Sequence, residues 1–319
     1  MNAKSQKKIV VIGGGTGVFT VLSGLKKYFE NLTAIVTMAD DGGSTGILRE
    51  EFGILPPGDI RRALVALSHS DNRVLSELFL YRFQEGSGLS GHSFGNLMIT
   101  ALERITGSFE KAVEEAGKIL SVKGRILPVS LKPSRLMAEL EDGSVIRGEV
   151  NIDIPKHDGT KKISRVWLEP NVTVNPVAQR AILEADLVII GPGDLYTSLI
   201  PNLLVRGVKE ALKKTKAKTV YFTNLMTKFG ETNGFQASDF IRTVNQHLLP
   251  GTVDYAIVNK TKPSVMRFRP YADEKSELVE ADIDSCGARP IPIAADLLRR
   301  SGLIRHDPEK IAELIRILV

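Results

Sequence analysis

The sequence predicts an α/β fold: a doubly wound parallel sheet with a small antiparallel, strand-rich insertion. Short apolar runs alternate with longer segments of helical spacing along most of the chain, which is typical of buried parallel strands joined by helices. The apolar fraction of 43% and the charged fraction of 25% are those of an ordinary folded protein. We therefore expect one domain over residues 1–319, with the insertion at about residues 126–174.

Five apolar runs supply the expected parallel strands, and most of the chain between them has helical spacing. The first strand leads through a glycine-rich turn into a helix that ends near Tyr28. Asp307 and Pro308 are typical of a helix start and predict a last helix through residues 311–319. The expected strands are residues 9–12, 33–37, 186–190, 219–223 and 253–258. The expected helices are residues 59–69, 73–83, 94–105, 109–120, 201–214 and 237–248.

The insertion has a different pattern from the rest of the chain. Two strand-like segments, residues 135–140 and 145–150, flank the sequence Glu-Asp-Gly-Ser at residues 141–144, which is a hairpin signal. Further strand-like segments follow at residues 163–168 and 172–174. We expect these segments to pair as a small antiparallel sheet.

Composition excludes several classes of protein. The single cysteine, Cys286, excludes an intrachain disulfide and a cysteine-rich zinc site. Part of the net charge of +5 lies in lysine runs such as residues 213–218, and aromatic residues make up only 6%, so we expect no nucleic-acid binding. The start of the chain has no apolar signal core and no segment is long enough for a membrane span, so we expect a cytoplasmic protein.

The first motif is the turn Gly-Gly-Gly-Thr-Gly at residues 13–17. Glycines let backbone N–H groups approach a phosphate at a helix N-terminus, although such a turn can also serve the fold alone. The dinucleotide-binding fingerprint is incomplete, because Val18 or Thr20 stands where its third glycine belongs. The candidate ligand contacts in this turn are Gly14, Gly15, Thr16 and Gly17.

The second motif places two adjacent carboxylates, Asp40 and Asp41, before a run of small residues. Neighbouring carboxylates repel each other, so a cation, an arginine or donated hydrogen bonds should offset them. Two interpretations of this motif stay open: the pair binds Mg²⁺, or the segment is a solvated loop with a helix cap. The candidate ligand contacts here are Asp40, Asp41, Gly43, Ser44 and Thr45.

The third motif is Pro-Pro-Gly-Asp-Ile-Arg-Arg at residues 56–62. Asp59 suits a helix N-cap, whereas Arg61 and Arg62 fall in the first helical turn, where the helix dipole disfavours cations. An anionic ligand would explain them, and an ion pair with the acid pair of the second motif is the alternative. Asp59 and Arg61 are the candidate contacts.

Polar residues also mark three other places. Ser93 and Asn96 stand at an expected helix start beside His92, although a loop histidine is more often structural than catalytic. Other polar residues follow the strands at 186–190 and 219–223. Because the carboxyl ends of parallel strands share one edge, we expect a single crevice that binds a phosphorylated ligand. The further candidate contacts are Ser93, Asn96, Gly193, Asp194 and Asn224.

Together, in this order, these motifs resemble the CofD-like superfamily over roughly residues 7–318, and more nearly its gluconeogenesis factor branch. The resemblance implies a Rossmann-like fold and a cytoplasmic regulatory protein that binds UDP-N-acetylglucosamine and acts in carbon partitioning toward cell-wall precursors and in cell shape. It implies that Arg305 and Tyr271 contact the UDP-sugar. A protein partner in amino-sugar synthesis and a homo-oligomer stay open. Pro308 stands where some members carry a phosphorylatable threonine.

The 2-phospho-L-lactate transferase branch implies the alternative, a Mg²⁺-dependent transferase that moves a phosphoryl-linked group from a nucleotide donor. Here Pro-Pro-Gly-Asp-Ile-Arg at residues 56–61 stands where that branch has a different segment, which counts against transfer to a deazaflavin. The motifs contain no nucleophile–base pair, so no catalytic residue is assigned and no cofactor is expected to be required. An NAD(P)-binding protein is a third interpretation.

Overall fold

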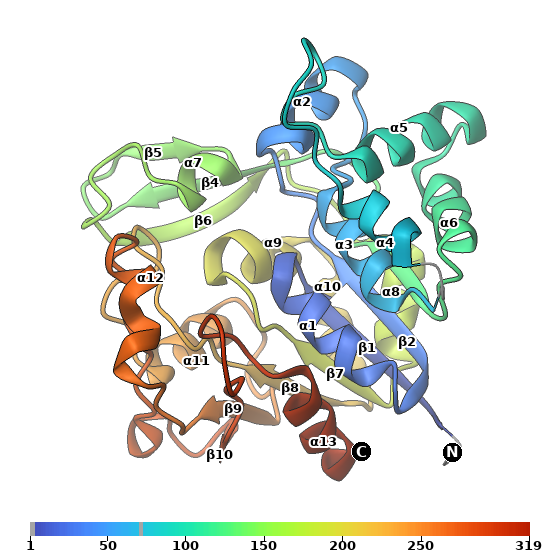
Figure 1. The fold of residues 1–319 in the computed structure, drawn as a ribbon. Helices are drawn as coiled ribbons and strands as arrows, with labels where there is room; N and C mark the ends of the chain where they lie inside the picture. Colours follow the sequence, from blue (N-terminus) through green and yellow to red (C-terminus); the bar gives the residue numbers. More distant parts are fainter. Residues whose placement is uncertain (1–3, 70–72) are drawn as a thin grey trace.

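The computed structural model describes residues 4–69 and 73–319, in which seven parallel strands form the central sheet (Figure 1). The strand order is β10-β9-β8-β7-β1-β2-β3, and each neighbouring pair runs parallel. The five predicted strands all lie in this sheet, so the predicted doubly wound sheet is confirmed. The strands are β1 (Ser5–Gly13), β2 (Phe29–Val36), β3 (Arg125–Pro128), β7 (Leu187–Ile190), β8 (Lys218–Phe222), β9 (Tyr255–Asn259) and β10 (Ile291–Ala295).

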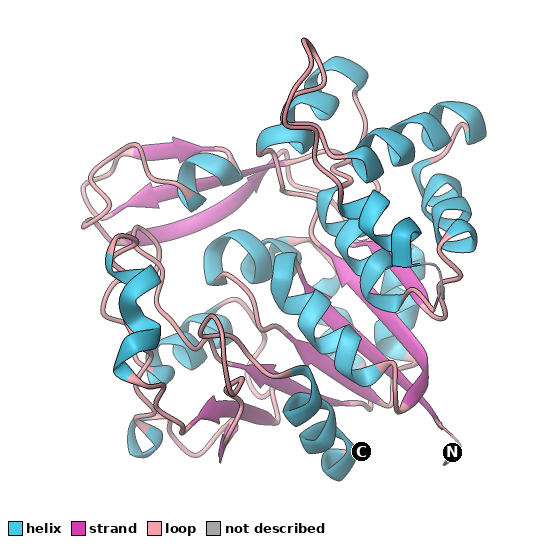
Figure 2. Ribbon diagram, in the orientation of Figure 1, coloured by secondary structure: helices cyan, strands magenta, loops and turns pink. Residues whose placement is uncertain are grey.

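Helices cover both faces of the sheet (Figure 2). On one face α1 packs against α3 and α13, and on the other α10 packs against α8 (Figure 1). Within residues 4–69 and 73–319, none of the helices is both long and apolar enough to cross a membrane. The helices are α1 (Gly15–Leu25), α2 (Gly43–Phe52), α3 (Gly58–Leu67), α4 (Arg73–Leu80), α5 (Phe94–Thr106), α6 (Phe109–Ile119), α7 (Glu149–Asp153), α8 (Pro176–Leu183), α9 (Ile200–Leu204), α10 (Val208–Lys214), α11 (Ala237–Gln246), α12 (Arg269–Ala272) and α13 (Pro308–Leu318).

The predicted insertion forms a separate antiparallel sheet in the order β5-β4-β6. Its predicted start was wrong: residues 126–128 belong to β3, which pairs with β2 in the main sheet, because this apolar run is buried there. Residues 172–174 make only an isolated bridge, from Thr173 to Arg206. The strands of this second sheet are β4 (Arg135–Leu140), β5 (Val145–Arg147) and β6 (Ile163–Glu169).

Two glycines explain where other predicted boundaries failed. Gly207 has a φ of +99° and separates α9 from α10, so the single helix expected over residues 201–214 is interrupted. Gly148 has a φ of +94° and ends the strand expected over residues 145–150, after which α7 begins. Both values lie in the left-handed region that favours glycine and that a regular helix or strand does not contain.

The winding of the sheet reverses between β1 and β7. From β1 the chain adds β2 and then β3 on one side, whereas β7 and the later strands lie on the other side. Ile9, Ile12, Val188 and Ile190 on these two strands are fully buried, as expected for the centre of a sheet covered on both faces. Open α/β sheets bind ligands outside the carboxyl ends of the strands at such a reversal.

The turns that follow β1 and β7 are in direct contact. A Cβ atom on Gly17, in the first turn of α1, would lie 1.7 Å from the carbonyl oxygen of Pro192. Asn202 strengthens the contact, because its Nδ2 donates to the carbonyl oxygen of Gly13 at 3.1 Å. Gly17 therefore allows the close approach of two segments of protein backbone.

Replacement of Gly17 by alanine should destabilise the fold, because α1 or the turn after β7 must move to admit the methyl group. We expect Gly17→Ala to lose about 3 kcal/mol or more of unfolding free energy in chemical denaturation. Gly15→Ala is the matched control: its φ is +59°, but its Cβ would lie 3.6 Å from the nearest atom, so it should lose only about 1–2 kcal/mol. Equal losses in the two variants would contradict this interpretation.

Candidate ligand-binding site

A cavity of about 950 Å³ lies at the carboxyl edge of the sheet, where the turns after β1, β2, β7 and β8 meet. It also reaches α7 of the insertion and the loop before α13. The sequence-predicted ligand contacts that line it are Gly14, Gly15, Thr16, Gly17, Asp40, Gly43, Ser44, Thr45, Asp59, Arg61, Asn96, Gly193, Asp194, Asn224, Tyr271 and Arg305. The structure thus brings together segments that are distant in sequence.

Asp41 and Ser93 lie outside the lining. The carboxylate of Asp41 accepts a hydrogen bond from the backbone N–H of Val150 at 2.9 Å and lies 3.8 Å from Arg135. The hydroxyl of Ser93 is buried and accepts from Arg61 at 2.7 Å. These two residues support the walls of the cavity and do not face its interior. The pair Asp40–Asp41 is consequently split, with only Asp40 facing the cavity.

Asp59 holds the glycine-rich turn. Its Oδ1 accepts from the backbone N–H of Gly15 at 2.9 Å, and a Cβ on Gly14 would lie 2.5 Å from its Oδ2. The prediction that Asp59 caps its own helix was wrong, because Pro57 is the N-cap of α3 and Asp59 lies in the first turn. Asp59 instead accepts the hydrogen bond of Gly15, the first backbone N–H of α1. The next backbone N–H groups, those of Thr16 and Gly17, are then the ones that could approach a phosphate.

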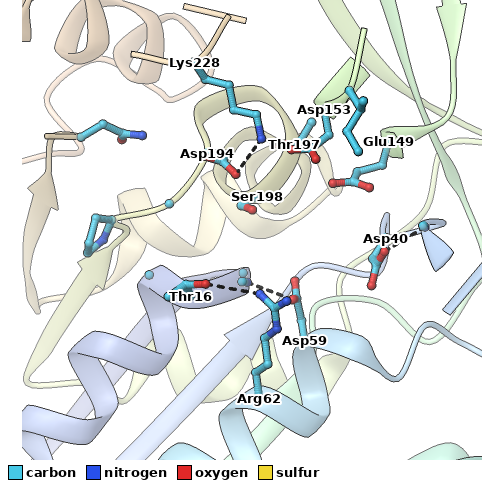
Figure 3. Close-up of a pocket in the computed structure, with 18 of the residues that line it drawn as sticks. Thr16, Asp40, Asp59, Arg62, Glu149, Asp153, Asp194, Thr197, Ser198 and Lys228 are labelled. Atoms are coloured by element: carbon cyan, nitrogen blue, oxygen red, sulfur yellow. Dashed lines mark hydrogen bonds and ion pairs between the residues drawn. The ribbon is translucent and has the colours of Figure 1, made fainter. Parts of the chain in front are cut away.

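Arg62 lies beside the same turn. Its Nη1 donates to the hydroxyl of Thr16 at 3.4 Å, and a Cβ on Gly15 would lie 3.7 Å from that Nη1 and 3.6 Å from the hydroxyl of Ser198 (Figure 3). One guanidinium and two hydroxyls therefore surround the turn at the strand reversal. The alternative interpretation of these arginines, an ion pair of Arg61 or Arg62 with Asp40 or Asp41, is wrong for the described residues, which form no such pair.

Three carboxyl groups form an acidic wall in the cavity: Asp40, Asp59 and Glu149 (Figure 3). Burial and the charge of Asp40 raise the pKa of Asp59 to about 6. Burial, Asp40 and Asp153 raise the pKa of Glu149 to about 10, so that Glu149 is protonated at neutral pH. Burial also raises the pKa of Asp40, so ionisation of all three carboxyl groups is unfavourable, and a bound cation would relieve this cost.

Lys228 joins the insertion to the main sheet. Its Nζ lies 3.5 Å from Asp194, after β7, and also forms an ion pair with Asp153 of α7 (Figure 3). Burial lowers the pKa of Lys228, but the carboxylates of Asp194, Glu231 and Asp153 outweigh burial and raise it overall. Buried Glu231 orders the segment just after Asp194, because its carboxylate accepts a hydrogen bond from the backbone N–H of Tyr196 at 3.1 Å.

The C-terminal side of the cavity is a loop stabilised by Tyr271. The Tyr271 hydroxyl accepts from the backbone N–H of Ile304 at 2.8 Å and donates to the carbonyl of the same residue at 3.2 Å. Exposed Arg305 follows directly and lines the cavity. Burial lowers the pKa of His306 to about 4, so this histidine is neutral at physiological pH. Tyr271 thus fixes the loop that presents Arg305.

Several lining residues escaped prediction from the sequence. Lys228 lies four residues after the candidate contact Asn224, at the end of the same polar segment after β8. Ser198 lies in the polar segment that follows β7, four residues after the candidate contact Asp194. Glu149 and Asp153 carry no recognisable signal, because a helix of five residues has too little periodicity.

The acidic wall suits a metal bound together with a nucleotide better than a metal bound by protein alone. Across the described parts of the chain, no three histidine, cysteine, aspartate or glutamate side chains are grouped to hold a metal ion. Mg²⁺ ordinarily takes one or two carboxylates, several waters and phosphate oxygens of the substrate. Asp40 and Asp59 fit that donor set.

The open parallel sheet, with a cavity of glycine turns at its strand reversal, defines a Rossmann-like α/β protein. Residues 9–298 match the family described as 2-phospho-L-lactate transferase CofD. The chain belongs to this CofD family.

Similar proteins cover nearly the whole chain. It is 44% identical over 314 residues to the "Gluconeogenesis factor" of Halalkalibacterium halodurans, which covers 97% of this chain and 96% of that protein. It is 42% identical over 317 residues to the "Gluconeogenesis factor" of Listeria innocua, with 99% and 96% covered. A crystal structure of a UPF0052 family member from Bacillus halodurans has a TM-score of 0.92 and 42% identity, and covers 98% of this chain and 100% of that one.

Replacement of Asp59 by asparagine should stabilise the protein at pH 7.5, because the ionised carboxylate is desolvated and repelled by Asp40. Asparagine keeps an oxygen that can accept from Gly15. The raised pKa of about 6 means that the penalty is complete above pH 6 and absent below about pH 4. We expect the unfolding free energy of Asp59→Asn to exceed wild type by about 1–3 kcal/mol at pH 7.5, with no difference at pH 4.

Asp186→Asn is the control of opposite sign. The backbone N–H of Lys8 lowers the pKa of Asp186, so the variant should be less stable than wild type at pH 7.5. Denaturant unfolding across this pH range measures both variants. A pH-independent effect at Asp59 would show that its carboxyl is not strained.

Proposed function

We propose that the chain is a cytoplasmic regulatory protein that binds UDP-N-acetylglucosamine and acts in carbon partitioning toward cell-wall precursors and in cell shape. The observation that carries this proposal is one continuous cavity that joins the glycine turn at the strand reversal to the loop of Arg305. The gluconeogenesis factors to which the chain is similar support the regulatory role.

The chemistry of the cavity matches the parts of a nucleotide sugar. The diphosphate would lie at the first turn of α1, where Arg62, Thr16 and Ser198 supply a cation and hydroxyls. Arg305 and the ring of Tyr271 would contact the nucleoside end, as in the resemblance stated above. The volume of about 950 Å³ is at the upper end of the roughly 300–1,000 Å³ common for small-molecule sites, so the whole ligand can enter.

A transferase remains the second candidate, and the acidic wall is the observation that favours it. Asp59 titrates near neutral pH, which suits proton transfer, and Asp40 beside it could share a metal with the donor phosphates. However, Asp59 accepts a hydrogen bond from the backbone of Gly15. This structural contact of Asp59 favours binding over turnover.

UDP-N-acetylglucosamine should bind with micromolar affinity, about −8 kcal/mol, and be recovered intact. Calorimetry with UDP-N-acetylglucosamine, UDP, GDP and NAD, followed by chromatography of the nucleotide, tests both points. Preference for GDP or NAD, or rapid consumption of the ligand with Mg²⁺, would replace the sensor with the transferase.

Arg305→Ala should weaken this binding by roughly 1.5–3 kcal/mol, because a charge-assisted contact with the ligand is lost. Arg300→Ala is the matched control, because Arg300 is also exposed on the same loop but lies outside the cavity lining. Equal affinities of the two variants would remove Arg305 from the site.

Mg²⁺ should strengthen binding of UDP through Asp40 and not through Asp41. Asp40 faces the cavity, whereas Asp41 is engaged with Val150 and Arg135. We expect Asp40→Asn to reduce the Mg²⁺-dependent gain in UDP affinity at least fivefold, and Asp41→Asn to keep it. Calorimetry with UDP, with and without Mg²⁺, measures the gain; an identical gain in wild type and Asp40→Asn would contradict the assignment.

A further inference from the structure

A second arginine of the cavity is buried without a direct ion pair among the described residues, and only Asp59 and Asp40 act on its charge from beyond ion-pair distance. The side chain of Arg61 is only 5% exposed and lines the cavity. Its Nη1 donates to the Ser93 hydroxyl at 2.7 Å and to the Phe79 carbonyl at 3.4 Å, while its Nε has no partner among the described residues. No carboxylate of the described chain forms an ion pair with it. A buried guanidinium without an anion is costly.

The position of Arg61 is built into the fold. A Cβ atom on Gly95 would lie 2.7 Å from Cδ of Arg61 and 2.5 Å from the carbonyl oxygen of Phe79. Only glycine at this position leaves room for the arginine stem against the start of α5. The guanidinium is therefore held in place, whereas a surface arginine would move freely.

Further positive and donor groups surround it. Arg82 lines the same cavity, and its Nη1 donates to the carbonyl oxygen of Gly91. Burial together with Arg62 and Arg82 lowers the pKa of Arg61 to about 10. Asn96, only 2% exposed, donates to the hydroxyls of Ser44 and Thr45, and its Oδ1 has no partner among the described residues. Ser44 and Thr45 lie in the first turn of α2, and Asn96 lies in the first turn of α5. The dipoles of both helices add positive potential at these ends.

This corner is distinct from the glycine turn. Arg61 and Arg62 are consecutive on α3, so their side chains leave the helix about 100° apart. Arg62 reaches Thr16 of α1, whereas Arg61 reaches Ser93 at the start of α5. A diphosphate held at the glycine turn would leave Arg61 without its anion.

We propose that Arg61, Arg82 and Asn96 form a second anion subsite, which binds the phosphate group of a small molecule beside the bound nucleotide. Two guanidinium groups and the starts of two helices gather here, which suits the several oxygens and double charge of a phosphate better than the two oxygens of a carboxylate. The cavity would then hold two ligands at once. The existence of the subsite does not depend on which nucleotide binds at the glycine turn.

Inorganic phosphate titrated by calorimetry into the free protein and into the UDP-saturated protein tests the proposal. We expect phosphate to bind in both cases, and at least tenfold more weakly to Arg61→Gln than to the wild type. Arg62→Gln is the matched control, which should lower the affinity for UDP and retain phosphate binding. If UDP fails to bind, the titration of free protein still tests the subsite.

Arg82→Gln provides the second variant, because Arg82 is exposed and its loss should leave the fold intact. It should weaken phosphate binding at least threefold, even if Arg61→Gln does not fold. Phosphate binding that UDP abolishes, or that neither variant weakens, would overturn the subsite. Acetate binding as tight as phosphate binding would overturn the assignment to a phosphate group.

Discussion

The contact between the first turn of α1 and the turn after β7 determines where everything else in the site can lie. Gly17 faces the carbonyl of Pro192 at a distance that excludes any side chain, and Asn202 bonds the carbonyl of Gly13 behind it. The two turns at the strand reversal therefore form one rigid unit. The start of α1 thereby lies next to Asp194 and Ser198, which no local property of either segment would dictate.

The charged groups around this unit are arranged in a way that favours binding of a charged ligand at the expense of the stability of the ligand-free fold. Asp59 and Glu149 are held where burial raises their pKa, and Arg61 is buried away from any ion pair within the described chain. Lys228, in contrast, is fully compensated by acidic neighbours from the insertion and the sheet. Uncompensated groups of both signs in one cavity are expected where ligand charges complete the electrostatics.

The sequence predicted the sheet and most of the cavity because both follow from simple periodic rules. Polar turns after apolar strands must meet at one edge, so Asp194 and Asn224 could be placed beside the glycine turn before the fold was known. These rules do not predict in which direction each side chain points. Neighbouring residues Asp40 and Asp41 diverge because Val150 and Arg135 attract only the second, and these partners lie about 100 residues away. Glu149 enters through the insertion, whose docking no local pattern encodes.

Helix α1 also contacts the segment that follows Arg305. Near its C-terminus, a Cβ on Gly24 would lie 2.0 Å from the carbonyl oxygen of Pro308, the first residue of α13. The loop that carries Arg305 ends at this junction, and Tyr271 fixes its other side through Ile304. The N-terminus of α1 thus lies in the glycine turn, and its C-terminal part packs against the residue at which the loop of Arg305 ends. A ligand that bridges the glycine turn and Arg305 meets a preorganised distance, so little conformational entropy need be lost on binding.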